Sequence, residues 1–264
     1  MRARGPGFAT FLGTLGGSRG TSSPRQTRMN LGFHGRRWVR RWDYLAEPGY
    51  RNCTAGYAVV LNSPAMRVTT ATGANKIAEH YEYAHDNLMG SIGGGGDWWT
   101  LRQSVRCWVS DTIATNPQGE AFAGIGLGSL KSAPPFANNW NVNYLAAVQL
   151  RYNFAAAQWE FSVYDCDEAA PTVEACTVQP GGFGSNSAAE LRIEYYPLGE
   201  VRCFVSEQMV HRYDGQRLGG LYLNSSGSDA GGGHFLTSGS HASGQMRARF
   251  TMFEAVTYGA KARA

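Results

Sequence analysis

The chain lacks the sequence features that mark several broad classes of protein. It contains no run of about 18 consecutive apolar residues, so no membrane-spanning helix is expected. The motifs G-x-x-x-x-G-K-[ST], G-x-S-x-G and H-E-x-x-H are also absent. Its five cysteines form no C-x-x-C pair and no Cys/His spacing typical of zinc ligands. We therefore expect no metal, no cofactor and no catalytic residues.

Helical patterns are equally scarce. No amphipathic segment of ten or more residues stands out, whereas 34 glycines and 10 prolines among 264 residues suit many short strands and turns. Alternation of apolar and polar residues instead predicts a series of strands. These fall at residues 57–61, 66–71, 80–83, 99–109, 121–130, 144–152, 158–165, 189–215 (a hairpin of two strands), 218–224 and 244–256.

So many strands, each with one apolar face, must bury that face against a second sheet. We predict an all-β fold, a two-sheet antiparallel jelly-roll sandwich over residues 46–264. The hairpin at 189–215 predicts part of its core: Leu191, Ile193, Val201, Cys203 and Val205 alternate with other residues. Its connection, residues 197–199, predicts a left-handed glycine that sets the register.

Several segments in the second half carry a resemblance to a known superfamily. They are a strand with G-x-G-L-G, then AVQLRY, then LRIEY followed by a turn and VRCFV, and finally RARFTMFEAVTYG. In this order they resemble a concanavalin A-like (laminin-G/pentraxin-type) jelly roll. That superfamily includes lectins, glycosidases, polysaccharide lyases and structural modules, so the resemblance implies a fold and not a function.

The acidic residues do not form the pattern of a glycosidase. Such enzymes on this fold carry carboxylates at alternate positions of one strand, and the E-x-D-x-x-E motif is absent. Glu160, Asp165, Asp167 and Glu168 are interpreted as solvated acids. The spaced glycines of residues 124–129 are expected to make room for a large side chain such as Trp108 or Trp140.

Aromatic residues near glycine-rich segments are the better candidates for binding. They could stack on sugar rings or on a neighbouring subunit, and burial in the sandwich is the alternative for each. The candidates are Trp98, Trp99, Trp108, Trp140 and Tyr144.

The cysteines give one further prediction. Cys107 and Cys203 lie on inward strand faces, where a thiol fills space as a small apolar group. Cys166 and Cys176 flank an acidic loop that a disulfide between them would close. The odd number of cysteines leaves at least one thiol free or paired between chains.

Charge divides the chain in two. Residues 1–42 hold nine arginines and no acidic residue, whereas the remaining 15 basic and 20 acidic residues leave the rest at −5. A transit peptide or a disordered tail has the same composition. We predict instead a docking arm over residues 1–45 for another protein subunit, and regard nucleic acid as the less favoured partner. Its candidate docking residues are Arg2, Arg4, Phe8, Phe11, Arg19, Arg25, Arg28, Arg36, Arg37, Trp38, Arg40, Arg41 and Trp42.

A basic arm before a jelly-roll body resembles the subunits of tailed-bacteriophage particles. The resemblance implies a non-enzymatic virion protein, of the decoration, collar or fibre type, that self-associates and binds other virion subunits. Two alternatives remain open: a carbohydrate-binding adhesin that contacts a surface glycan, and a polysaccharide-cleaving enzyme on the same fold.

Overall fold

The computed structural model describes the strands of the chain and some of the segments between them. The described residues are 25–30, 35–42, 52–53, 58–62, 65–69, 77–83, 98–114, 122–130, 144–164, 170–182, 188–196, 199–215, 232–239 and 246–261. Among them, no helix is long and apolar enough to cross a bilayer. The predicted strand at 218–224 lies outside this part of the chain.

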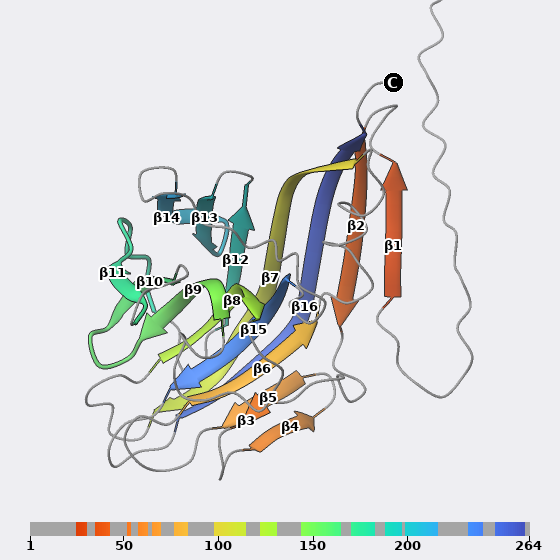
Figure 1. Cartoon of the computed structure of the whole chain (residues 1–264). Helices are drawn as coiled ribbons and strands as arrows, with labels where there is room; N and C mark the ends of the chain where they lie inside the picture. Colours follow the sequence, from red (N-terminus) through yellow and green to blue (C-terminus); the bar gives the residue numbers. More distant parts are fainter. Residues whose placement is uncertain are drawn as a thin grey trace, which may run out of the picture.

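The described elements are strands in two antiparallel sheets (Figure 1). The nine-stranded sheet has the order β1-β2-β16-β7-β12-β13-β14, with β5 pairing with β16 and β4 pairing with β5. Its strands are β1 (Arg25–Asn30), β2 (Gly35–Trp42), β4 (Ala58–Asn62), β5 (Ala65–Thr69), β7 (Trp98–Ala114), β12 (Ala189–Tyr195), β13 (Glu200–Val205), β14 (Gln208–Asp214) and β16 (Met246–Lys261).

The seven-stranded sheet has the order β11-β10-β9-β8-β15-β6-β3. Its strands are β3 (Asn52–Cys53), β6 (Ile77–Tyr83), β8 (Phe122–Leu130), β9 (Tyr144–Asn153), β10 (Gln158–Tyr164), β11 (Thr172–Ala175) and β15 (Gly232–Gly239). The predicted all-β sandwich is therefore confirmed.

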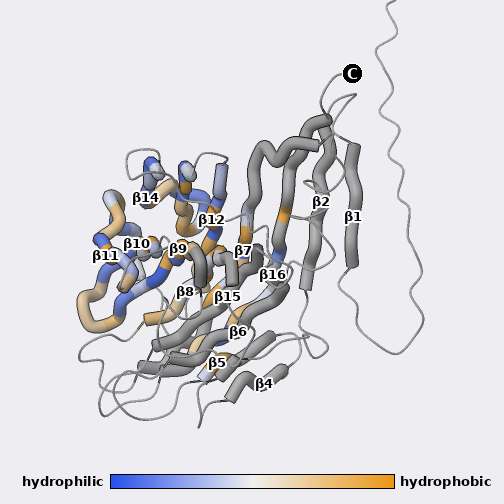
Figure 2. Tube along the Cα trace, in the orientation of Figure 1, coloured by the Kyte–Doolittle hydropathy of each residue, from blue (hydrophilic) through white to orange (hydrophobic). Residues whose placement is uncertain are grey.

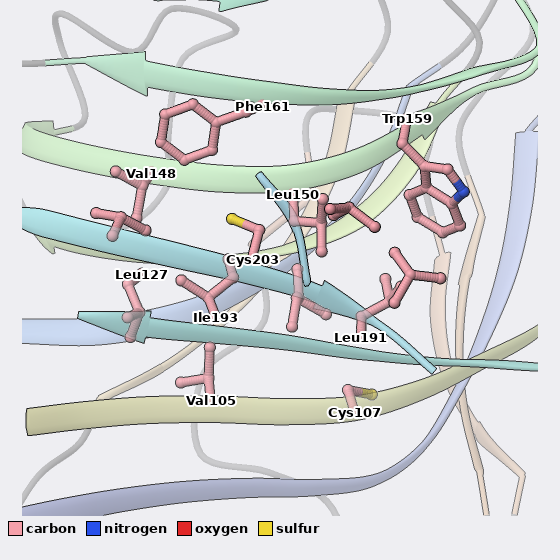
Figure 3. Close-up of a cluster of buried hydrophobic side chains, with 14 of the residues drawn as sticks. Val105, Cys107, Leu127, Val148, Leu150, Trp159, Phe161, Leu191, Ile193 and Cys203 are labelled. Carbon is pink, nitrogen blue, oxygen red and sulfur yellow. The ribbon is translucent and has the colours of Figure 1, made fainter. Parts of the chain in front are cut away.

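The core lies between the two sheets and follows the period of two in the strands. Figure 3 shows Val148, Leu150 and Phe161 of the seven-stranded sheet facing Leu191 and Cys203 of the nine-stranded sheet. Each of these five side chains is fully buried. Along the strands drawn in colour, Figure 2 shows hydrophobic and hydrophilic residues alternating, as expected when one face of each strand is in the core.

The hairpin of β12 and β13 agrees with its sequence pattern. Its five predicted core residues are buried to 3% exposure or less, and Leu191 pairs with Val205 and Ile193 with Cys203. Gly199 has a φ of 89°, the left-handed conformation that was predicted for it. The Tyr196 amide donates to the Glu200 carbonyl at 2.8 Å, which closes the connection.

The N-terminal region differs from the extended arm expected over residues 1–45. Residues 25–30 and 35–42 form a hairpin, and β2 pairs with β16 from Gly35 to Trp42. Figure 1 shows β2 and β1 continuing the nine-stranded sheet beyond β16. The basic composition concealed these strands, because strand pairing uses the backbone and arginine-rich residues can supply it as well as apolar ones.

Candidate functional site

Strands β9 and β10 carry different residues on their two faces. One face holds core residues such as Leu150 and Phe161, which face the other sheet and are fully buried from solvent. The opposite face is polar, yet it is also buried. Its five polar residues keep between 1% and 8% of their surface exposed: Gln149, Arg151, Asn153, Glu160 and Ser162. We call these five residues the polar cluster. The outward face of a sandwich sheet is normally solvated, so a buried polar one is unusual.

A short turn sets the register that brings these residues together. Residues 154–157 connect the two strands, and Asn153 pairs with Gln158 across the turn. The Asn153 side-chain oxygen Oδ1 accepts from the amides of Ala155 and Ala156 at 3.0 and 3.1 Å. Such Asx interactions favour turn formation. The resulting register places Arg151 opposite Glu160 and, two positions along β9, Gln149 opposite Ser162.

Glu160 is the centre of a hydrogen-bonded network. Its Oε2 accepts from Nε of Arg151 at 2.8 Å, and its Oε1 accepts from the amide nitrogens of Asn153 at 2.9 Å and Gln158 at 3.0 Å. The Arg151 guanidinium also lies over the Phe122 ring, 4.3 Å from its centroid. The two opposite charges are therefore paired within the protein, as buried charges require. Glu160 is not the solvated acid that the sequence interpretation expected.

Two atoms of the polar cluster have no partner. Oε1 of Gln149 and Oγ of Ser162 are buried and make no hydrogen bond. An unsatisfied buried polar atom costs about 1–3 kcal/mol. Such atoms are rare in native structures, and a polar group from outside the protein would satisfy them. Because Gln149 and Ser162 are direct cross-strand partners, their free atoms belong to one place on the sheet.

Strand β8 borders the polar cluster with glycines. Gly124 pairs with Arg151, and Gly126 pairs with Gln149. A Cβ atom at Gly124 would overlap the Leu150 carbonyl oxygen and the Arg151 backbone, so this glycine is required by the close approach of β9. Gly126 places no side chain beside Gln149. The prediction that Trp108 packs on these glycines is wrong, because Trp108 pairs with Glu190 in the nine-stranded sheet.

The described part of the site reaches solvent at β11. Val173 pairs with Ser162, so the two residues share one face of the sheet, and Val173 is 42% exposed. All four residues of β11 are exposed. A row of paired positions thus runs from Gly126 through Gln149 and Ser162 to an exposed edge strand.

The predicted aromatic candidates do not gather at this site. Trp108 is half-buried in β7, with the Arg106 guanidinium 5.0 Å from its ring centroid. Trp98 and Trp99 begin β7 and Tyr144 begins β9, while their side chains and Trp140 lie outside the described part of the chain. Trp108, whose side chain is described, therefore does not lie at the polar cluster.

Some of the candidate docking residues lie in the hairpin of β1 and β2. Strand β1 contains Arg25 and Arg28, and β2 contains Arg36, Arg37, Trp38, Arg40, Arg41 and Trp42. The remaining candidates, Arg2, Arg4, Phe8, Phe11 and Arg19, lie outside the described residues. Docking by this region stays a prediction.

The cysteines behave in part as expected. Cys107 and Cys203 are buried in the core cluster and form no disulfide, as predicted. Cys176 is also a free, buried cysteine, so the structure does not form its predicted disulfide with Cys166, which is outside the described residues. The reason is packing: Cys176 belongs to the core cluster, and its amide donates to the Trp159 carbonyl at 2.9 Å. Burial raises the pKa of Cys176 to about 12.

The sequence interpretation missed the polar cluster. Residues 144–152 are predicted as one strand, in which Gln149 and Arg151 alternate with Val148 and Leu150. The available signal was that alternation, repeated by Glu160 and Ser162 between Trp159 and Val163. It suggested a polar outer face but could not show that this face is buried.

No family model matches the chain, and no curated protein matches it. Solved structures do resemble it. A protein of unknown function from Shewanella oneidensis MR-1 is 10% identical, with a TM-score of 0.52 over 90% of this chain and 92% of the other.

Two further likenesses have lower TM-scores. The carbohydrate recognition domain of Emp47p is 10% identical, with a TM-score of 0.46 over 81% of this chain and 91% of that domain. Alginate lyase A1-II', of polysaccharide lyase family 7, is 11% identical, with a TM-score of 0.42 over 75% of this chain and 81% of the lyase. At these identities the likeness concerns the fold alone. The chain is an all-β jelly-roll sandwich of two antiparallel sheets.

Proposed function

We propose that the protein is a non-enzymatic carbohydrate-binding sandwich that holds a sugar on the polar cluster of β9 and β10. The observation that carries the proposal is the pair of buried, unpartnered atoms, Oε1 of Gln149 and Oγ of Ser162. They lie on the face that points away from the core, beside Gly126, which contributes no side chain.

A sugar hydroxyl suits these two atoms chemically. An amide oxygen only accepts, whereas a serine hydroxyl both donates and accepts. A hydroxyl group can donate to Gln149 and accept from Ser162 at the same time, which removes both unsatisfied positions. The satisfied network around Glu160 holds the neighbouring backbone and side chains in place, so part of the binding geometry exists before the ligand arrives.

The same network is the reason for proposing binding without catalysis. Glycoside hydrolysis needs two carboxyl groups, one of them able to give or take a proton. Among the positions of β8, β9, β10 and β11 on the polar face, Glu160 is the one carboxylate, and it accepts three hydrogen bonds from Arg151, Asn153 and Gln158. A residue committed in this way holds its neighbours and is poorly placed to exchange a proton with a substrate.

Glycan-array screening followed by calorimetry tests the proposal. The wild-type protein should bind at least one oligosaccharide, and Gln149→Ala and Ser162→Ala should each weaken that binding by roughly tenfold or more. Arg212→Ala is the matched control, because Arg212 is exposed and in β14 of the other sheet. Binding that both cluster variants retain in full would overturn the proposed site.

The catalytic alternative is tested with the same ligands. Incubation with each bound polysaccharide should yield no shortened product by mass spectrometry. Accumulation of shortened chains with the wild-type protein would show that it is an enzyme, and the assignment of Glu160 to positioning would then have to be abandoned.

The virion-subunit prediction calls for a different experiment. Deletion of residues 1–42 would remove β2 and expose the edge of β16, so a failure to assemble could reflect a damaged sheet. Deletion of residues 1–24 leaves β1 and β2 in place. If the first 24 residues dock the subunit, this shorter deletion should abolish incorporation into particles while the sandwich still unfolds cooperatively.

A further inference from the structure

We infer that the polar cluster selects neutral sugars and discriminates against uronates, the sugars whose C6 hydroxymethyl group is replaced by a carboxylate. The inference rests on the proposed carbohydrate site and names the class of sugar that the site takes. Two independent features of the cluster carry the inference. The first is the ion pair that its arginine already forms, and the second is the hydrogen-bonding role, acceptor or donor, of its unpartnered atoms.

The arginine of the cluster is already neutralised. Arg151 donates Nε to Glu160 at 2.8 Å, and both side chains keep 8% or less of their surface exposed. One face of the guanidinium lies over the Phe122 ring. Recognition of a carboxylate by arginine normally uses two parallel N–H groups of an accessible fork. Nε of Arg151 already donates to Glu160, and the charges of Arg151 and Glu160 sum to zero.

The positions that flank the polar cluster on β8, β10 and β11 carry no other charged residue. Gly124 and Gly126 of β8, Gln158 of β10 and Val173 of β11 carry none. A carboxylate brought here would lose its hydration without gaining a cation, which is strongly unfavourable in a buried place.

The unpartnered atoms also suit a hydroxyl better than a carboxylate. Oε1 of Gln149 can only accept, so it needs a donor. An ionised carboxylate has no donor for Oε1 and leaves that buried atom unsatisfied, even where the Gln149 amide nitrogen or the Ser162 hydroxyl donates to the carboxylate. A hydroxymethyl group donates to Gln149 and accepts from Ser162. A site built to bond a hydroxyl rejects an analogue that cannot do so, because its own buried atoms are then left unpaired.

Three matched pairs of oligosaccharides test this discrimination by calorimetry. They are trisaccharides of mannose and mannuronate, of glucose and glucuronate, and of galactose and galacturonate, and each pair differs only at C6. For whichever stereochemistry binds, the neutral member should bind roughly tenfold or more tightly than its uronate partner at pH 7. Gln149→Ala should abolish this preference along with most of the affinity.

Two variants should move the selectivity in the opposite direction. Glu160→Gln keeps the side-chain volume but removes the negative charge, which leaves Arg151 free to attract a carboxylate. Gln149→Lys replaces the unpartnered acceptor with a cation, and it provides the same test if the first variant does not fold. Either variant should shift the ratio of uronate to neutral affinity upward by roughly tenfold or more. Arg212→Ala should leave the ratio unchanged.

The possible failures are distinguishable. If no oligosaccharide of any pair binds to the folded wild-type protein, the carbohydrate function is wrong and the inference falls with it. If a uronate binds as tightly as its neutral partner and Gln149→Ala removes that binding, the site is correct and the inference about charge is overturned. If both variants fold and neither changes the ratio, Arg151 and Gln149 do not set the selectivity, which also overturns it.

Discussion

The buried pair of Arg151 and Glu160 allows a quantitative test of how the polar cluster is held. Glu160→Ala leaves the Arg151 guanidinium buried without its counter-ion and removes the acceptor for Asn153 and Gln158. Loss of one partner of a buried ion pair costs about 3–5 kcal/mol. Arg151→Ala should cost a similar amount or slightly less, because Glu160 keeps its two amide donors.

Replacing both residues should be far milder. In the double variant R151M/E160L no charge remains buried, and apolar residues of similar volume fill the space. Its free energy of unfolding should be closer to wild type than that of either single alanine variant. The coupling free energy between positions 151 and 160 should then exceed that of an exposed ion pair. Arg212 and Glu200, 3.0 Å apart, provide such a pair for comparison. Because Arg212 is 58% exposed, R212A should cost about 0.2–1 kcal/mol.

Urea unfolding followed by tryptophan fluorescence is the assay, since Trp159 is fully buried in the core. With an m-value of about 2–3 kcal/mol/M, a loss of 3–5 kcal/mol lowers the midpoint by roughly 1–2 M urea. If each single alanine variant lost less than about 1 kcal/mol, the pair would not be buried in the way the structure shows. A double variant less stable than both singles would refute the charge argument in the same way.

Three other predictions concern protonation, backbone packing and thiol access. Burial lowers the pKa of His211 below its ordinary 6.5, partly offset by the carboxylate of Glu174. The unfolded state therefore binds the proton more readily, and the free energy of unfolding should fall as the pH drops below about 6.5; His211→Gln should flatten that slope in urea titrations. Gly124→Ala should cost about 1–3 kcal/mol in the same titrations, because a Cβ there meets the backbone of β9, whereas Gly181→Ala, with open space around it, should be nearly neutral. Because burial raises the pKa of Cys176 to about 12, this thiol should resist alkylation at pH 8 until the protein is denatured, and labelling of the native protein in peptide maps would contradict its burial.

The sequence predicted the fold well where alternation was regular. Leu191, Ile193 and Val201 alternate with polar residues, and such a pattern can bury only one face of a strand. The left-handed Gly199 was equally predictable, because the connection between the strands is short and only glycine adopts that conformation at little cost.

The candidate site was not predictable in the same way. Alternation in β9 placed Gln149 and Arg151 away from the core, but burial of that outward face depends on atoms from distant parts of the chain. The pairing of Glu160 with Arg151 depends on the register of two strands and hence on the geometry of one turn. Composition misled at the N-terminus, where eight residues of β2 with four arginines still pair with β16.

The turn between β9 and β10 has a consequence for anyone who modifies this protein. Asn153 and the four residues after it decide which side chains of the two strands share a face, since Ala157 with its φ of 52° completes the reversal. An insertion or deletion of one residue there would shift the pairing by one position, so that one of the two strands carries its polar residues towards the core and its apolar residues outward. Loop grafting at this hairpin is therefore far more hazardous than its exposed alanines suggest, and libraries that diversify the protein should keep the turn length constant.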